Sequence, residues 1–303
     1  MANVLLVDDR PEREVATIAE NLRRRGLDVS VLHPRDVDDG DLRSTDLLLV
    51  DFELSAEQWD QDDLPPANRC ENGWALATTL RWQMARVDVR PTPGLVAILT
   101  NEIGRALVPF DGGGSAAAGI ISSLNGVEWV FSKGGGDQML DQIATLASSV
   151  SAVASPMDVE CLKQLLGVPE GSRYWEDLLQ SGIPATELLD WKEGIALYRW
   201  MLHRVMPYPT FLISDLWLAA RMGVRPSSVR SLIESSASLA NALREAEYTG
   251  FLSGFMGRRW WARKVESVLW THTNGDSSSI STIREIVAEA LGVAVDHIQE
   301  GGV

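Results

Sequence analysis

The stretch Val4-Leu5-Leu6-Val7-Asp8-Asp9 decides the fold, because four apolar residues run directly into two carboxylates. Three later stretches repeat this pattern, namely residues 47–50 before Asp51, residues 95–99 before Thr100, and residues 127–131, interrupted only by Glu128, before Ser132 and Lys133. Short apolar runs separated by helix-like stretches are typical of buried strands in a parallel sheet. The carboxyl ends of such strands meet at one edge, where ligands bind. The sequence therefore predicts an α/β fold, a doubly wound parallel five-stranded sheet. One edge of it gathers three carboxylates, a hydroxyl and an ammonium group.

These groups favour phosphoryl-transfer chemistry. Three clustered carboxylates repel one another unless a cation lies among them, and hard oxygen ligands suit Mg²⁺. The ion would offset the repulsion, leave one carboxylate able to attack phosphorus, and neutralise charge on the transferring group. Lys133 would pair with a phosphoryl oxygen or with Asp51, and Thr100 would donate a hydrogen bond once Asp51 carries phosphate.

On these residues, the first half of the chain, about residues 1–152, resembles the response-regulator receiver domain, the CheY-like phosphoacceptor module of two-component signalling. The resemblance implies that Asp51 is the phosphoacceptor, Thr100 the switch hydroxyl and Lys133 the family's lysine. It also implies that Asp9 and Asp51 bind Mg²⁺ directly, together with the backbone carbonyl of Glu53, while Asp8 acts through water. The alternative is an ordinary flavodoxin-like sheet with acidic loop ends and no phosphorylation.

The chain departs from the family pattern at several places. Residues 55–72 form an acidic insertion, and residues 111–118 have the composition of a flexible lid. Glycines 134–136 stand where the family has proline after the lysine. Val130 takes the place of the switch aromatic, with Trp129 and Phe131 on either side. These departures keep open a pseudo-receiver, which retains the fold but binds partners constitutively.

Composition limits the class of protein. The 303 residues are enough for about two domains, and 45% hydrophobic and 23% charged residues are typical of soluble globular chains. We expect no membrane span, no signal peptide and, with two distant cysteines, reduced thiols in a cytoplasmic protein. The net charge is −15, of which −11 falls in residues 1–150 and −4 in residues 151–303. This acidity disfavours non-specific nucleic-acid binding.

Residues 157–273 are expected to form an all-helical output domain, because the apolar residues there recur at helical spacing. Within it, residues 216–234 resemble a helix-turn-helix with Gly223 at the turn and Pro226 in the first turn of the second helix. Its exposed face would present four residues to DNA: Arg225, Ser227, Ser228 and Arg230, with Ser231 beside them. The local basic charge is low, so a helical hairpin for protein contacts is an equal alternative.

Two further stretches bear on the role of the second half of the chain. Residues 258–264 place four basic residues around two indoles, which predicts either a phosphate-contacting and base-stacking segment or an amphipathic helix with its tryptophans in the core. Residues 274–303 form a linker followed by a C-terminal helix from Ile283 to Leu291. Thr282 and Glu285 would make its capping box. We expect this helix to lie on the surface or to dock a partner.

Together these features predict a cytoplasmic response regulator that is not an enzyme apart from catalysing transfer to its own Asp51. A sensor histidine kinase or phosphotransfer protein would donate the phosphoryl group in the presence of Mg²⁺, and the helical domain would signal through protein contacts. A DNA-binding transcriptional regulator and a pseudo-receiver adaptor are the alternatives. A homodimer is left open.

Overall fold

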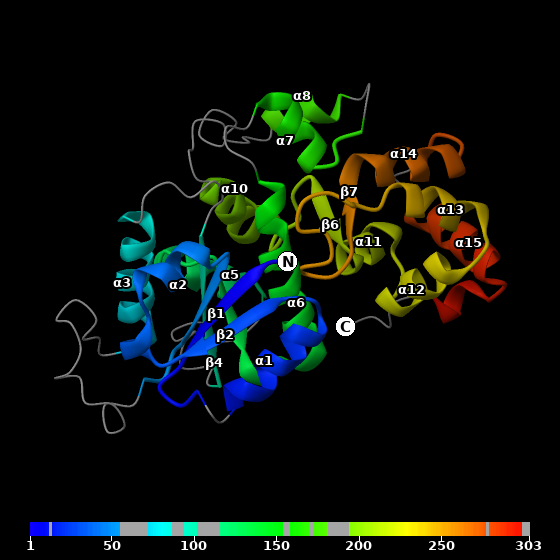
Figure 1. The fold of residues 1–303 in the computed structure, drawn as a ribbon. Helices are drawn as coiled ribbons and strands as arrows, with labels where there is room; N and C mark the ends of the chain where they lie inside the picture. Colours follow the sequence, from blue (N-terminus) through cyan, green and yellow to red (C-terminus); the bar gives the residue numbers. More distant parts are fainter. Residues whose placement is uncertain are drawn as a thin grey trace. The chain divides into compact units, whose positions relative to one another are not determined.

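The computed structural model describes residues 1–11, 14–54, 72–86, 94–101, 115–153, 158–169, 173–180, 194–276 and 279–298 (Figure 1). The predicted insertion, except for Asn72, and residues 111–114 of the predicted lid lie outside these ranges. The chain divides into two compact units. Unit 1 comprises Met1–Leu165 and Pro184–Pro207, and unit 2 comprises Leu166–Ile183 and Tyr208–Val303. Among the described residues, no helix has both the length and the apolar character needed to cross a membrane.

Unit 1 contains a five-stranded parallel sheet. The strands are β1 (Asn3–Val7), β2 (Asp28–Leu32), β3 (Leu47–Asp51), β4 (Leu95–Thr100) and β5 (Trp129–Ser132). Their order is β2-β1-β3-β4-β5, and every neighbouring pair is parallel. This is the doubly wound flavodoxin/CheY-like order, so the predicted fold is confirmed. The predicted strands β1, β3, β4 and β5 begin or end within two residues of the apolar runs.

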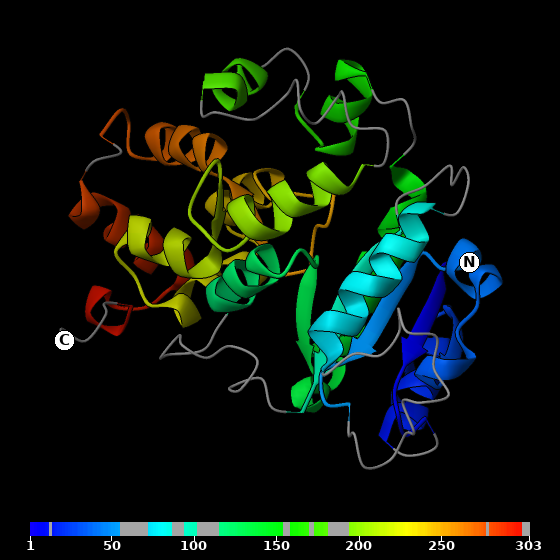
Figure 2. The same ribbon diagram turned by 90° about the vertical axis from the view of Figure 1, so that its left-hand side faces the viewer.

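Helices cover both faces of this sheet, with α1 (Glu14–Arg24) and α6 (Gly136–Ser149) side by side on one face (Figures 1 and 2). The other face packs against α2 (Asp39–Ser44), α3 (Gly73–Arg86) and α5 (Ser115–Leu124). The core on this second face joins strand residues such as Val50, Ile98 and Val130 to Leu76 and Ile121 of the helices. Burial of both faces explains why the central strands are apolar throughout.

The register of β5 decides which side chain can take the place of the family's aromatic residue. Val130 pairs with Ile98 and lies in the same core cluster as that residue. Because successive side chains of a strand alternate between faces, Trp129 and Phe131 belong to the opposite face. Neither aromatic residue therefore substitutes for an aromatic side chain at position 130.

The helices after α6 divide between the units. Unit 1 holds α7 (Val159–Leu165), α10 (Ile195–Trp200) and the π-helical turn η6 (Met201–Val205), while α8 (Tyr174–Gln180) belongs to unit 2. Residues 184–207 thus group with the sheet, although the prediction placed them in the helical domain at residues 157–273. Short 3₁₀ turns complete the chain: η1 (Pro34–Asp36), η4 (Lys133–Gly135), η5 (Val150–Ala152) and η7 (Val295–His297).

Unit 2 is mainly helical. Besides α8, its described helices are α11 (Asp215–Met222), α12 (Pro226–Glu234), α13 (Ser238–Glu245), α14 (Ala262–His272) and α15 (Ile280–Leu291). An antiparallel pair of short strands, β6 (Leu212–Ser214) and β7 (Arg259–Trp261), accompanies them, so the expectation of an all-helical domain is wrong in this detail.

The α11–α12 turn and the last helix meet at Gly223. This residue has φ +65°, and a Cβ there would lie 2.3 Å from Cγ2 of Ile280 in α15. Helix α15 also contributes the buried Ile283 and Val287 to the core of unit 2, which corrects the expectation of a surface or docking helix. It begins one turn earlier than predicted, because the side chain of Ser279, and not that of Thr282, caps it.

Candidate functional site

The carboxyl edge of the sheet brings together the acidic residues predicted from the strand ends. Asp8 and Asp9 follow β1 directly, and Asp51 is the last residue of β3. All three are buried, with 3%, 8% and 6% of their surface exposed. One carboxylate oxygen from each residue lies within 4.8 Å of the others. We call Asp8, Asp9, Asp51 and Lys133 the acidic pocket.

Lys133, the first residue after β5, bridges two of these carboxylates. Its Nζ lies 3.2 Å from Oδ2 of Asp8 and 3.1 Å from Oδ2 of Asp51. Backbone amides hold the other oxygens: the N–H of Arg10 donates to Oδ1 of Asp8 at 2.6 Å, and the N–H of Glu53 donates to Oδ1 of Asp51 at 3.4 Å. Backbone N–H groups therefore fix one oxygen of Asp8 and one of Asp51, and the ammonium group of Lys133 lies between the other two oxygens.

The charges of this pocket are not balanced. Burial raises the pKa of Asp51, the charge of Lys133 opposes this and the charge of Asp8 adds to it, so that the net pKa of Asp51 is about 7. Burial by itself lowers the pKa of Lys133, but the charges of Asp51 and Asp8 outweigh burial and raise it overall. One ammonium group thus faces more negative charge than it can neutralise.

The remaining predicted residues of this edge lie close to the acidic pocket along the chain. Thr100 ends β4 and is fully buried, and its register partner is Ser132, next to Lys133. Asp51 pairs with Leu99, so Thr100 lies one residue further along the neighbouring strand. The side chain of Glu53 is exposed, and its backbone is two residues from Asp51.

The donor set fits a divalent cation. Three carboxylate oxygens within a few ångströms are hard ligands of the type that Mg²⁺ and Ca²⁺ bind, and the cluster carries more negative charge than Lys133 neutralises. The third carboxylate, Asp9, lies beside a second cationic group, with its Oδ2 4.0 Å from Nε of Arg10.

Gly73 is a residue of this edge that strand-end reasoning missed. It begins α3, and its N–H donates to the carbonyl oxygen of Phe52 at 3.0 Å. A Cβ at this position would lie 2.0 Å from the carbonyl oxygen of Asp51 and 2.6 Å from Cα of Phe52. The close approach of α3 to the end of β3 thus requires glycine. The Asn-Gly pair before an apolar helical stretch was the available sequence signal.

The predicted DNA-contacting residues lie in unit 2, on and just before α12. Arg225, Ser227 and Arg230 are exposed, as expected, but Ser228 is buried at 8% exposure, so it cannot belong to the outer face. The helix turns Ser228 inward beside Val229, which corrects its assignment. Trp260 and Trp261 are buried as well, which leaves no indole in residues 258–264 free to stack on bases.

Comparisons with known proteins were made against families, curated proteins and solved structures. No family model matches this chain, and no curated protein matches it either. Several solved structures resemble it in part, and three of them are described next.

The first is a response regulator protein from Burkholderia pseudomallei with a phosphorylated aspartic acid, calcium ion and citrate. It has 16% identity and a TM-score of 0.31 over 68% of this chain and 99% of that one. The second is the response regulator ChrA of a heme-sensing two-component system, with 14% identity and a TM-score of 0.30 over 81% of this chain and 90% of that one. The third is a flavodoxin from Streptococcus pneumonia TIGR4, with 16% identity and a TM-score of 0.25 over 50% of this chain and 97% of that one. The fold assignment rests on the strand order described above.

Substituting Gly73→Ala should disturb the acidic pocket from outside it. The added Cβ overlaps the carbonyl oxygen of Asp51, so the end of β3 or the start of α3 must move. We expect at least tenfold weaker Mg²⁺ binding, measured by calorimetry, in a protein that keeps its far-UV circular dichroism. The matched control is Gly134→Ala, whose Cβ would meet only Oγ of Ser132 at 3.8 Å. Equal affinities of the two variants would contradict this role of Gly73.

Substituting Asp51→Asn should change how stability depends on pH. The pKa of Asp51 is about 7 in the folded protein, and that of an aspartate in the unfolded chain is about 4. Between about pH 4 and pH 7, Asp51 of the folded wild type therefore carries a proton that the unfolded chain has lost. Its free energy of unfolding therefore falls as pH rises through this window, and the loss is complete above pH 7. Urea unfolding with a chelator present should show Asp51→Asn gaining at least about 1.4 kcal/mol over wild type between pH 5 and pH 8, the equivalent of one pKa unit. Asp28→Asn, at an exposed aspartate, should show no such gain.

Proposed function

We propose that this chain is a two-component response regulator that accepts a phosphoryl group on Asp51. The observation that carries the proposal is the buried contact of one ammonium group, Lys133 Nζ, with carboxylates from two different strand ends, beside a third carboxylate. Burying three carboxylates with only one ammonium group costs folding free energy, which a cluster with a purely structural role would not offset. Binding a cation and accepting a phosphoryl group would give each of these charged groups a functional role.

Each residue of the acidic pocket has a role in this proposal. An oxygen of Asp51 forms a bond to the phosphorus of the donor's phosphohistidine while the bond from phosphorus to the histidine nitrogen breaks and the donor's imidazole leaves. Lys133 then pairs with a phosphoryl oxygen. Thr100 donates its hydroxyl hydrogen to the phosphorylated aspartate. Asp9, Asp51 and the backbone carbonyl of Glu53 would hold Mg²⁺ directly, and Asp8 would hold it through water. When bound, the cation neutralises charge on the transferring group.

The proposed partners follow from the chemistry of the phosphoryl group. The donor is a sensor histidine kinase or a phosphotransfer protein in the cytoplasm, and the chain catalyses only transfer to its own aspartate. The output partner is a protein that contacts unit 2. The low basic charge around α12 favours a protein, because nucleic-acid binding depends on many phosphate contacts.

Phosphorylation with a small acyl-phosphate donor tests this function directly. Wild-type protein incubated with acetyl phosphate and Mg²⁺ should gain the mass of one phosphoryl group, and Asp51→Asn should gain none. Asp28→Asn serves as the matched control and should behave like wild type. An Asp51→Asn protein that still takes up one phosphoryl group would contradict the assignment. A wild-type protein that takes up none, with or without Mg²⁺, would select the pseudo-receiver.

A second candidate function is sequence-specific DNA binding through α11 and α12. The observation in its favour is the geometry of the turn: Gly223 ends α11 in the left-handed region, and Pro226 begins α12 two residues after Val224. The exposed Arg225, Ser227 and Arg230 then lie at the start and on the outer face of the second helix, where a major groove is read.

Binding to promoter fragments at two salt concentrations separates the two outputs. If Arg230 contacts a base, Arg230→Ala should weaken specific binding by about 1–3 kcal/mol and relax the preference at one base pair. If Arg230 contacts a phosphate instead, the slope of log affinity against log salt concentration should become shallower by about one. Arg244→Ala would be a poor control, because Arg244 bonds to the carbonyl oxygens of Ile233 and Ser235. Arg43→Ala, at an exposed arginine of α2 in unit 1, is suitable. Absence of salt-sensitive binding by wild type would leave the protein-contact output.

A further inference from the structure

The path of the chain between the two units is unusual. Unit 2 begins at Leu166, but residues 184–207 return to unit 1 before unit 2 resumes at Tyr208. The described part of this return, residues 194–207, consists of α10 and the π-helical turn η6. We call residues 194–207 the strap. Its last residue is joined directly to the first residue of the larger part of unit 2.

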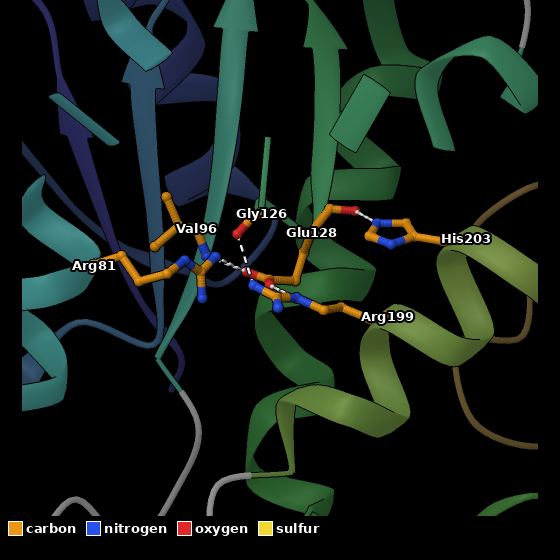
Figure 3. A network of polar contacts seen from close by, with 6 residues as sticks. All are labelled: Arg81, Val96, Gly126, Glu128, Arg199 and His203. Atoms are coloured by element: carbon orange, nitrogen blue, oxygen red, sulfur yellow. Dashed lines mark hydrogen bonds and ion pairs between the residues drawn. The ribbon is translucent and has the colours of Figure 1, made fainter. Parts of the chain in front are cut away.

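A buried carboxylate holds the strap to the sheet (Figure 3). Glu128 is fully buried, and its Oε2 accepts hydrogen bonds from Nη2 of Arg81 at 2.5 Å and from the N–H of Val96 at 2.6 Å. Its Oε1 accepts from Nε of Arg199, in α10, at 3.2 Å. Nη2 of the same arginine donates to the carbonyl oxygen of Gly126 at 2.7 Å.

The turn after α10 contacts the same residue through its backbone. Nε2 of the buried His203 lies 2.9 Å from the carbonyl oxygen of Glu128 and donates to it, because a carbonyl only accepts. Arg199 and His203 thus bind the carboxylate and the backbone of one residue, as Figure 3 shows. Removing one partner of a buried ion pair leaves an uncompensated charge. The strap therefore stabilises the buried charge of Glu128, and Glu128 in turn holds the strap in place.

Two more contacts extend the strap across neighbouring helices of unit 1. The hydroxyl of Tyr198 lies 3.0 Å from Oγ of Ser149 at the end of α6. On α5, Gly119 leaves room for the strap: a Cβ there would lie 3.2 Å from Cγ of Pro207 and 3.3 Å from the carbonyl oxygen of Leu202. The strap therefore contacts α5, the start of β5 and α6.

The strand β5 connects this interface to the acidic pocket. Glu128 immediately precedes β5, and Lys133 immediately follows it. We propose that the strap is the coupling element between the pocket and unit 2, held in place by Glu128 and loosened when Asp51 is phosphorylated. The coupling rests on the proposed function, whereas the hold by Glu128 does not.

The direction of the effect follows from Lys133. In this structure its ammonium group lies between Asp8 and Asp51. A phosphoryl group on Asp51 draws the ammonium toward its own oxygens, and Thr100 turns toward the same group from the strand paired with β5. The end of β5 must adjust, and the other end of this short strand carries the contacts of Glu128. The π-helical turn, where the N–H of Met206 bonds to the carbonyl oxygen of Met201 at 2.8 Å, is where the strap opens.

Hydrogen exchange of the full-length protein tests the hold. In wild type the amides of residues 197–206 should be protected, and Arg199→Ala should speed their exchange at least tenfold while leaving β3 unchanged. Arg204→Ala is the matched control, because Arg204 is exposed on the same turn and makes none of these contacts. Arg199→Lys should restore part of the protection. Gly119→Val, which pushes on the strap without touching Glu128, should also speed exchange there. Equal exchange rates of these amides in wild type, Arg199→Ala and Gly119→Val would overturn the proposal that Glu128 holds the strap in place.

The coupling is tested with the same peptides before and after treatment with acetyl phosphate and Mg²⁺. Protein whose mass shows the phosphoryl group should exchange at least threefold faster across residues 197–206, and Asp51→Asn should show no change. Phosphorylated protein with unchanged or slower exchange would overturn the coupling. Wild type that takes up no phosphoryl group would contradict the proposed function and the coupling with it. The comparison of Arg199→Ala with Arg204→Ala would still decide whether Glu128 holds the strap.

Discussion

The position of Lys133 between two buried carboxylates is the interaction on which the rest of unit 1 depends. Its Nζ lies within 3.2 Å of oxygens from Asp8 and Asp51, which come from the ends of different strands. The contact exists only because β1, β3 and β5 are parallel and in register, so that their carboxyl ends meet at one edge. A pocket with one base for three acids is stable as a structure only at the cost of a raised pKa at Asp51. That residual negative charge is of the kind that a bound cation would offset.

Much of this edge could be predicted from the sequence, because a parallel sheet converts position along the chain into position in space. Residues that follow apolar runs must gather at the same edge, however far apart they are in sequence. Gly73 could not be predicted in this way, because its role is the distance between a helix and a neighbouring backbone, which no periodicity records. Ser228 was wrongly assigned to the exposed face of α12 for a related reason. It lies at the boundary between the polar and apolar faces, and residue spacing alone does not show that its side chain is buried next to Val229.

The second half of the chain shows a different limit. Helical periodicity identifies an apolar face, but it does not say which core that face enters. The strap was therefore assigned to the helical domain, although its buried Leu197, Met201 and Leu202 lie in unit 1. Helix α15 was expected on the surface, although Ile283 and Val287 complete the core of unit 2. The interruption of an apolar run by Glu128 was the clue to the first error. A carboxylate in the middle of a buried stretch requires cationic partners, and these could only come from elsewhere in the chain.

The side chain at position 130 bears on how a signal can leave the acidic pocket. Val130 is packed in the core with Ile98, and the neighbouring aromatics face the other side of the sheet, so rotation of a ring next to Thr100 is not available here. A change at Asp51 must then act through groups that are bonded to it or to the strands beside it. Lys133 is one such group, and it is covalently continuous with β5, whose opposite end is tied to α3 and α10 through Glu128. Ion pairs thus hold both ends of this short strand, so a displacement of either end would strain charge-assisted hydrogen bonds. In the proposed coupling, the backbone of β5 would therefore take over the task that an aromatic side chain performs in the receiver family.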